Sequence, residues 1–147
     1  MSEIDDFEIQ TILYEISKKI ILPKFKNLKE NDIKLKNNKD IVTSVDISVE
    51  KKLKNILLRL LPNSLFVGEE SFFLDPNISK YYLENKFCWT VDPIDGTNNF
   101  VKGKDKFAIM IGLTFKEKII QSWIFKPVSG DFYYAKLENG AFINNKK

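Results

Sequence analysis

The sequence predicts a single α+β domain, with two helices in its first half and a largely antiparallel sheet in its second half. Near the N-terminus, two stretches repeat apolar residues at three- and four-residue steps, as one face of a helix does. From Lys106 onward, short apolar runs lie between turns rich in Gly, Asn and Asp, which is typical of a meander of strands. With 147 residues, of which 44% are hydrophobic, the chain suits one layered domain with a substantial core.

The first helix is predicted over residues 4–28. Pro23 falls inside this pattern, and because proline lacks a backbone N–H and its ring clashes with the preceding turn, the helix should end or kink near Leu22. The apolar positions that define the pattern are Ile9, Leu13, Ile16 and Ile20.

A second helix is predicted to start at Thr43, after a polar loop at residues 37–40. Asp46 follows Thr43 by three residues, in an arrangement close to a capping box. Pro62 and Asn63 should stop this helix. Its apolar stripe consists of Val49, Leu53, Ile56, Leu57 and Leu60.

The sheet is predicted from short apolar runs separated by turn residues. One strand should cover residues 64–67 and end at Gly68, and another should cover residues 87–91. The stretch 72–86 is interpreted as a loop with a short helix. The later strands are predicted at residues 107–113, 119–125, 132–135 and 141–143.

Two absences from the composition exclude several kinds of catalysis. The chain has no His, which excludes Ser-His and Cys-His nucleophile pairs and disfavours a catalytic zinc site. Cys88, the single cysteine, lies between Phe87 and Trp89 and is interpreted as a buried structural thiol. Hydrolytic chemistry would therefore rest on carboxylates, hydroxyls, lysines or a hard metal ion.

The charge pattern favours a cytoplasmic protein without specific nucleic-acid or membrane binding. The net charge is +3, and the lysines are scattered rather than clustered as in nucleic-acid readers. Residues 1–6 lack the basic start and apolar core of a signal peptide. No apolar run approaches the ~20 residues of a membrane span.

The most informative stretch is an apolar strand that runs directly into two carboxylates, Asp92 and Asp95. Pro93 between them fixes φ, and Gly96 after them permits a tight turn and close approach to a ligand. Two adjacent carboxylates repel each other unless a cation or a proton lies between them. Oxygen ligands of this kind favour Mg²⁺. The alternative is a surface turn rich in Asp, Pro and Gly.

Two further acidic segments indicate a functional site more strongly in combination than each does alone, because of their order along the chain. Glu69 and Glu70 follow a predicted strand and Gly68, a pattern that alone would describe solvated acids. The segment 40–46 contains Thr43 and Asp46, which alone would describe a helix cap.

Together these residues resemble the inositol monophosphatase family, whose members are Mg²⁺-dependent and typically lithium-sensitive phosphatases. The likeness runs over nearly the whole chain and implies the N-terminal part of a layered αβαβα sugar-phosphatase fold. The motifs are Asp40-x-Val42-Thr43-x-x-Asp46, Gly68-Glu69-Glu70-Ser71, Trp89-x-x-Asp92-Pro93-Ile94-Asp95-Gly96-Thr97-x-Asn99-Phe100 and Gly140-Ala141-Phe142-x-Asn144.

The resemblance implies a metal-binding set. Glu69, Asp92, Asp95 and the backbone carbonyl of Ile94 would ligate Mg²⁺, and Asp92 would bridge two ions. Glu70 would support these ligands. Two such ions can lower the pKa of a bound water and stabilise both the attacking and the leaving oxygen.

The resemblance also implies a catalytic and substrate-binding set. Asp46, Glu69 and Thr97 would orient or deprotonate the attacking water. Asp95 would contact the substrate, and Gly96 and Thr97 would donate backbone N–H groups to its phosphate.

The chain departs from the family pattern beyond Gly140. Family members are about twice as long, and their second half supplies another metal-binding Asp in a Trp-Asp-x-Ala motif. Here Trp89 is followed by Thr90 and Trp123 by Ile124. We therefore expect an N-terminal metal-binding domain at 1–147 without the C-terminal domain, little phosphatase activity from this chain alone, and a homodimer only for a full-length version.

The function predicted from the resemblance is hydrolysis of a small polyol or sugar phosphate, with inositol 1-phosphate as the default substrate. A nucleotide 3′-phosphatase or a histidinol phosphatase of the same superfamily stays open. A non-catalytic binding module associated with the transcription machinery also stays open.

Overall fold

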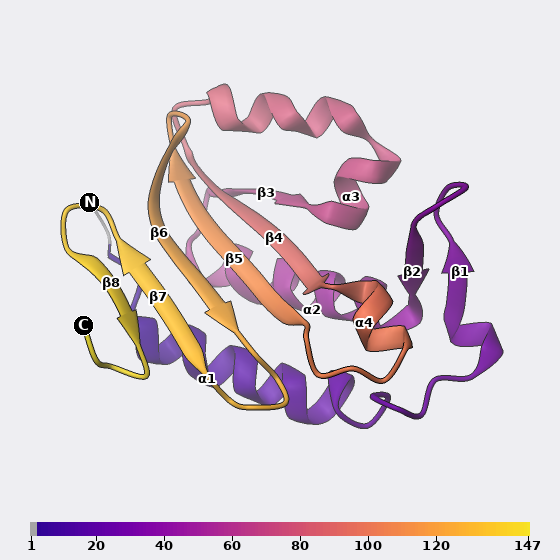
Figure 1. The fold of residues 1–147 in the computed structure, drawn as a ribbon. Coiled ribbons are helices and arrows are strands. Elements are labelled where there is room, and N and C mark those ends of the chain that lie inside the picture. The colour runs from indigo at the N-terminus through magenta and orange to yellow at the C-terminus, as the bar shows by residue number, and fades with distance from the viewer. Residues whose placement is uncertain (1–2) are drawn as a thin grey trace.

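Helices pack on a central sheet in the structure, a computed structural model that describes residues 3–147 (Figure 1). A six-stranded sheet has the order β3-β4-β5-β6-β7-β8. Helices α1 (Asp6–Ile16) and α2 (Ser44–Leu60) pack on one face of this sheet. The strands are β3 (Leu65–Gly68), β4 (Phe87–Asp95), β5 (Ala108–Phe115), β6 (Lys118–Phe125), β7 (Phe132–Lys136) and β8 (Gly140–Ile143). The predicted α+β class and largely antiparallel sheet are confirmed.

The first helix follows its sequence pattern and ends where proline was expected to end it. The Asp5 side chain caps α1 by accepting a hydrogen bond from the backbone N–H of Phe7, at 2.9 Å. A π-helical turn, η1 (Ser17–Ile21), then leads into irregular turns around Pro23. The buried residues of α1 are Ile9, Leu13 and Ile16.

A small hairpin that the sequence did not predict lies between the two helices. A short 3₁₀ turn, η2 (Glu30–Asp32), leads into β1 (Ile33–Leu35), which pairs antiparallel with β2 (Ile41–Thr43). The predicted polar loop at 37–40 is the turn of this hairpin. Strands of three residues are too short to show a periodic pattern, so the turn was visible in the sequence and its strands were not.

The second helix begins as its capping residues predict. Thr43 is the N-cap of α2, and its side chain and that of Asp46 form the reciprocal pair of a capping box. Val49, Leu53 and Leu57 of the predicted stripe are fully buried.

Strands β3 and β4 run parallel, whereas every other neighbouring pair in the large sheet is antiparallel. Helix α3 (Glu69–Leu74) follows β3 directly, and a 3₁₀ segment, η3 (Pro76–Leu83), then leads to β4. These two helical segments lie where the sequence predicted a loop with a short helix. Strand β4 is also longer than predicted and extends to Asp95, with a register shift against β5 between Asp92 and Asp95.

The core lies between the helices and the sheet and is rich in aromatic side chains. The Trp89 and Trp123 rings are 6.0 Å apart between centroids and fully buried. The N-terminal segment is attached to β6 by polar contacts as well. Ile4 and Gln121 exchange two hydrogen bonds of 3.0 Å, and Trp123 Nε1 donates to Asp6 Oδ1 at 2.8 Å.

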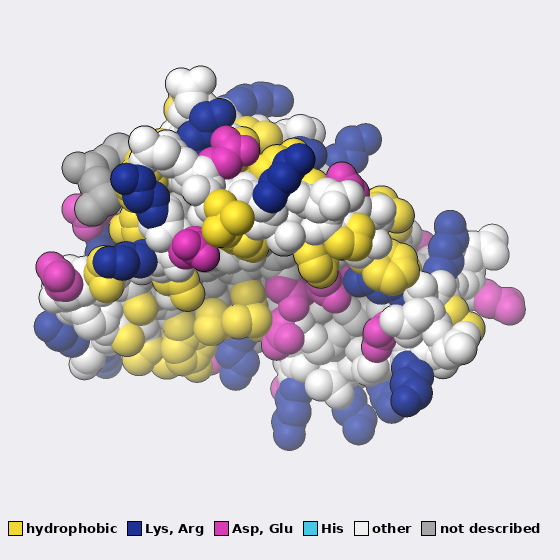
Figure 2. Space-filling model, turned by 90° about the horizontal axis from the view of Figure 1, so that it is seen from above, with side chains coloured by type: hydrophobic (Ala, Val, Ile, Leu, Met, Phe, Trp, Pro, Cys, Tyr) yellow, Lys and Arg dark blue, Asp and Glu magenta, His cyan; other side chains and the backbone are white. Residues whose placement is uncertain are grey.

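The face of the sheet turned away from α1 and α2 carries several exposed apolar side chains. Met110, Ile119 and Ile143 are 36%, 62% and 41% exposed, and each lies on the strand face opposite to the buried core positions. Figure 2 shows a broad hydrophobic area beside a hollow where acidic side chains gather. Within residues 3–147, no helix is long and apolar enough to cross a membrane. Met1 and Ser2, part of the segment without signal-peptide features, lie outside the described residues.

Candidate metal centre

The parallel pairing of β3 and β4 brings three acidic side chains to one end of the sheet. Gly68 at the end of β3 is the register partner of Val91 in β4. Glu69 and Asp92 each follow directly, so the two carboxylates reach the same edge. Asp95 is three residues farther along β4 and is exposed.

Asp92 is the most strongly perturbed acid of this group. Burial, together with repulsion from the neighbouring carboxylates of Glu69 and Asp95, raises the pKa of Asp92 to about 8. Among the described residues, its Oδ1 atom is buried and has no hydrogen-bond partner. A buried carboxylate oxygen without a partner is costly unless a proton or a cation is bound to it. The Asp92 environment therefore fits a hard cation.

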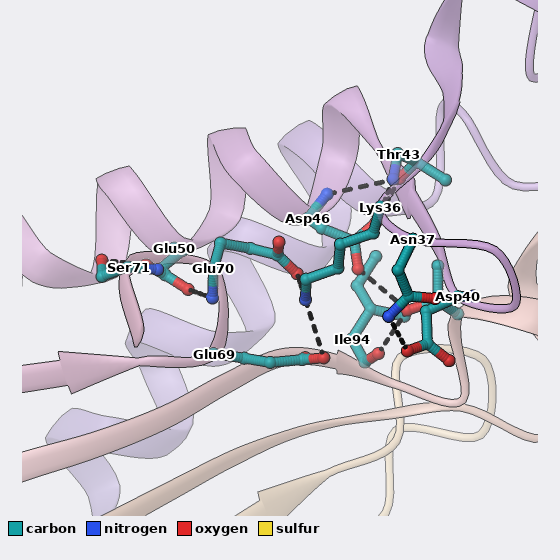
Figure 3. A network of polar contacts seen from close by, with 11 residues as sticks. Lys36, Asn37, Asp40, Thr43, Asp46, Glu50, Glu69, Glu70, Ser71 and Ile94 are labelled. Carbon is teal, nitrogen blue, oxygen red and sulfur yellow. Dashed lines mark hydrogen bonds and ion pairs between the residues drawn. The ribbon is translucent and has the colours of Figure 1, made fainter. Parts of the chain in front are cut away.

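A lysine from the hairpin lies between two of the acids (Figure 3). Lys36 Nζ is 3.2 Å from Glu69 Oε1 and 3.0 Å from Glu70 Oε1, and the lysine side chain is only 8% exposed. Burial lowers the pKa of Lys36, but Glu70 and Glu69 raise it above its ordinary value overall. Sequence reasoning missed Lys36 because its place depends on the unpredicted hairpin.

The carboxylates of Glu69, Asp92 and Asp95 do not surround a common point in this structure. As the side chains stand within residues 3–147, no group of three or more Asp, Glu, Cys or His side chains is arranged to hold a metal ion. Glu69 is half exposed and paired with Lys36.

A buried hydrogen-bond network links the start of α2 to the loop after β4. Asp46 is completely buried. Its Oδ2 accepts from the Thr43 backbone N–H at 2.8 Å and from the Thr43 hydroxyl, and its Oδ1 accepts from Thr97 Oγ1 at 3.0 Å. Thr97 Oγ1 is also 3.0 Å from the Ile94 carbonyl oxygen, so one hydroxyl proton serves two acceptors. Burial raises the pKa of Asp46, although the hydrogen bonds from Thr43 and Thr97 oppose that rise.

A second buried acid, Glu50 of α2, fixes the start of α3. Its carboxylate accepts from the backbone N–H groups of Glu70 at 2.7 Å and Ser71 at 2.9 Å, and also from the Ser71 hydroxyl (Figure 3). A Cβ atom at Gly68 would lie 2.2 Å from Glu50 Cδ, so only glycine leaves room for this contact. Sequence reasoning missed Glu50 because nothing local marks it as buried.

The turn after β4 has the backbone conformation that its glycine allows. Gly96 has φ +88°, and a Cβ atom there would lie 2.7 Å from the Lys106 carbonyl oxygen. The short helix α4 (Thr97–Val101) follows. Its first N–H groups have no partner within the helix.

The sequence of this chain is similar to phosphatases along its whole length. A model of the inositol monophosphatase family matches residues 1–147. The chain is 36% identical over 119 residues to inositol monophosphatase 1 of Homo sapiens, covering 80% of this chain and 42% of that protein. It is 29% identical over 128 residues to the fructose-1,6-bisphosphatase/inositol-1-monophosphatase of Aquifex aeolicus, covering 87% of this chain and 46% of that protein.

The fold is also similar to that of a solved structure. The extragenic suppressor protein suhB from Bartonella henselae superposes with a TM-score of 0.80 and 26% identity, covering 95% of this chain and 51% of that chain. This chain thus spans about half the length of the relatives that it matches.

Proposed function

The chain belongs to the inositol monophosphatase family, and we propose from that premise that it provides the Mg²⁺ and phosphate site of a phosphomonoesterase. The observation that carries this proposal is the buried Asp92 Oδ1, which has no hydrogen-bond partner in the described part of the chain and lies beside the carboxylates of Glu69 and Asp95. Oxygen ligands at such a site select a hard cation. Glu69, Asp92 and Asp95, with the carbonyl of Ile94, are the proposed ligands.

When bound, Mg²⁺ would acidify water and neutralise phosphate charge. The residues of the chain itself supply the proton handling. Thr97 donates its hydroxyl proton to Asp46 or to the Ile94 carbonyl, which leaves its oxygen lone pairs free to accept a hydrogen bond from the attacking water. Burial favours the protonated form of Asp46, so its carboxylate can take up a proton through Thr97. Glu69 would orient the same water.

The proposed substrate is a small polyol or sugar phosphate. The name of the human relative, inositol monophosphatase 1, makes inositol 1-phosphate the first compound to test. Gly96 and Thr97 would donate backbone N–H groups to the phosphate, and Asp95 would contact the substrate beside them. Lithium sensitivity and a cytoplasmic location belong to the same proposal.

Calorimetric titration of the 147-residue chain with Mg²⁺, with and without inositol 1-phosphate, tests the proposal. We expect Mg²⁺ to bind and to make phosphate-ester binding measurable. The variant Asp92→Asn should weaken Mg²⁺ binding by about tenfold or more, because it removes a charged ligand. Glu117→Gln, an exposed carboxylate in the β5–β6 turn, is the matched control and should bind normally. Equal Mg²⁺ binding by Asp92→Asn and the control would overturn the metal assignment.

A further inference from the structure

The short helix α3 is capped by an acid from another helix rather than by its own N-cap residue. That N-cap residue is Gly68, which has no side chain to accept from the first N–H groups of the helix. Instead, the carboxylate of Glu50 in α2 accepts from the backbone N–H groups of Glu70 at 2.7 Å and Ser71 at 2.9 Å. The start of α3 is therefore attached to α2 through its main chain.

Packing at Gly68 leaves no room for a local cap. A Cβ atom at this position would lie 2.2 Å from Glu50 Cδ, so a Ser, an Asp or any other capping side chain would displace the carboxylate. Glu50 is only 5% exposed, and the Ser71 hydroxyl donates to it as well. Both carboxylate oxygens thus accept hydrogen bonds from α3, and such charge-assisted bonds are stronger than those between neutral groups.

One face of α2 contacts the ends of both β3 and β4. Asp46 and Glu50 are four residues apart in this helix, so their side chains lie on the same face (Figure 3). Asp46 accepts from Thr97 in the segment after β4 at 3.0 Å, and Glu50 accepts from the helix that follows β3. Helix α2 thus holds both segments at which the proposed metal ligands lie.

We propose that Glu50 is a positioning residue for Mg²⁺ binding, because its cap fixes the main chain of α3 at Glu69. This inference rests on the proposed function, in which Glu69 ligates Mg²⁺ beside Asp92. The Glu70 N–H that Glu50 holds belongs to the planar peptide group directly after Glu69, so the hydrogen bond orients the backbone of the ligand itself. Glu50 acts through Glu69 and does not itself bind the ion.

A positioning residue differs from a purely structural cap in its response to the metal. If Glu50 holds Glu69 in the conformation that binds Mg²⁺, the bound ion must in turn stabilise the cap, because coupling between two sites is reciprocal. Mg²⁺ should therefore slow hydrogen exchange at the backbone N–H groups of Glu70 and Ser71. Without the Glu50 carboxylate, this slowing should be largely lost.

Calorimetric titration of the 147-residue chain with Mg²⁺, together with hydrogen exchange in EDTA and in Mg²⁺, tests the proposal. Glu50→Gln keeps the size of the side chain but replaces one acceptor oxygen with an NH₂ donor. We expect this variant to bind Mg²⁺ about tenfold more weakly, because hydrogen bonds that orient a metal ligand typically change affinity by about 10–100-fold. Ser71→Ala removes only the hydroxyl donor and should weaken binding less.

Gln121→Met is the matched control, because it removes buried hydrogen bonds outside the site. Gln121 is 2% exposed and exchanges two hydrogen bonds of 3.0 Å with the Ile4 backbone. This variant should lose stability against urea, as Glu50→Gln should, but it should bind Mg²⁺ like the wild type. Its hydrogen exchange at Glu70 and Ser71 should still slow in Mg²⁺.

The outcomes separate this inference from the proposed function. If the wild-type chain binds Mg²⁺ and Glu50→Gln binds it equally well, the positioning role is overturned and the metal site stands. Equal losses of affinity in Glu50→Gln and Gln121→Met would assign the effect to stability, which also overturns the role. If Glu50→Gln does not fold, unchanged affinity and unchanged exchange in Ser71→Ala overturn it. If the wild-type chain binds no Mg²⁺, both proposals are overturned.

Discussion

The Asp92 carboxylate destabilises the fold of the metal-free protein, and ligand binding would remove this destabilisation. Its Oδ1 is buried and has no hydrogen-bond partner within residues 3–147, and two other carboxylates lie near it. A proton relieves this arrangement when no cation is present. The same position should therefore control both the stability of the metal-free chain and its response to pH.

The folded-state pKa of Asp92 is about 8, above the ordinary 3.8, so the protonated form stabilises the fold. This stabilisation is fully present below about pH 4 and is lost as the pH rises through about 8. Asp92→Asn should thus raise the free energy of unfolding at pH 8 without metal, by about 1–2 kcal/mol. At pH 5 the gain should be much smaller. Urea denaturation in EDTA at both pH values measures this difference.

Glu117→Gln provides the control for the loss of an exposed carboxylate and should change stability little at either pH. At pH 8, saturating Mg²⁺ should make the wild-type chain more stable than Asp92→Asn, because only the wild-type chain gains stability from the bound ion. A stability gain of the same size at pH 5 and pH 8 would contradict the assigned pKa.

Among elements, the β1–β2 hairpin depends on one side chain for its attachment to α3. Lys36 Nζ contacts Glu69 and Glu70, and it also lies over the Phe73 ring, 5.1 Å from the centroid. A hairpin of two three-residue strands has little stability of its own. The ion pairs of Lys36 therefore hold the hairpin over the acidic cluster.

Lys36→Met should loosen the hairpin while leaving the main sheet intact. Loss of a partly buried lysine leaves Glu70 without its partner, which should lower the free energy of hairpin opening by about 1–3 kcal/mol. Hydrogen exchange at residues 33–43 should accelerate accordingly, whereas exchange in β4 and β5 should not change. Lys39→Met, in the exposed turn of the same hairpin, should exchange like the wild type. Equal protection in both variants would show that Lys36 does not anchor the hairpin.

The sequence predicted those elements whose signals are local. The capping pair Thr43 and Asp46, the break at Pro23 and the turn at Gly96 each depend on residues close along the chain, and each lies where it was expected. Features that depend on tertiary contacts were not predicted. The Lys36 ion pairs join residues 33 and 34 positions apart, and the burial of Glu50 depends on the glycine that ends β3.

For the molecule as a whole, α1 and α2 cover one face of the sheet, whereas on the opposite face η3 lies against β4, where Tyr82 Oη donates to Thr90 Oγ1 at 2.9 Å, and β6 and β8 carry exposed apolar side chains. Ile119 and Ile143 lie on the face opposite to α1 and α2 and remain accessible to solvent. Contiguous apolar surface on a soluble protein favours association. The chain should therefore self-associate through this face as its concentration rises.

Sedimentation velocity over a range of concentrations measures that association. Ile119→Lys combined with Ile143→Lys should shift the chain toward monomer, because each lysine places a charge in the apolar face. Phe7→Lys is the matched control, since Phe7 is 62% exposed, as Ile119 is, but lies on α1. If the control disperses the chain as well as the double variant does, the open sheet face is not the contact surface.

The attachment of the N-terminal segment to β6 has a consequence for biosynthesis. Ile4 and Gln121 are 117 positions apart, so the nascent α1 leaves the ribosome long before the strand that covers it. At about 5–20 residues per second, the interval is on the order of ten seconds. Throughout that time the stripe formed by Ile9, Leu13 and Ile16 has no sheet to pack on. Chaperones that bind apolar helices would meet this protein at its N-terminus, while it is still being translated.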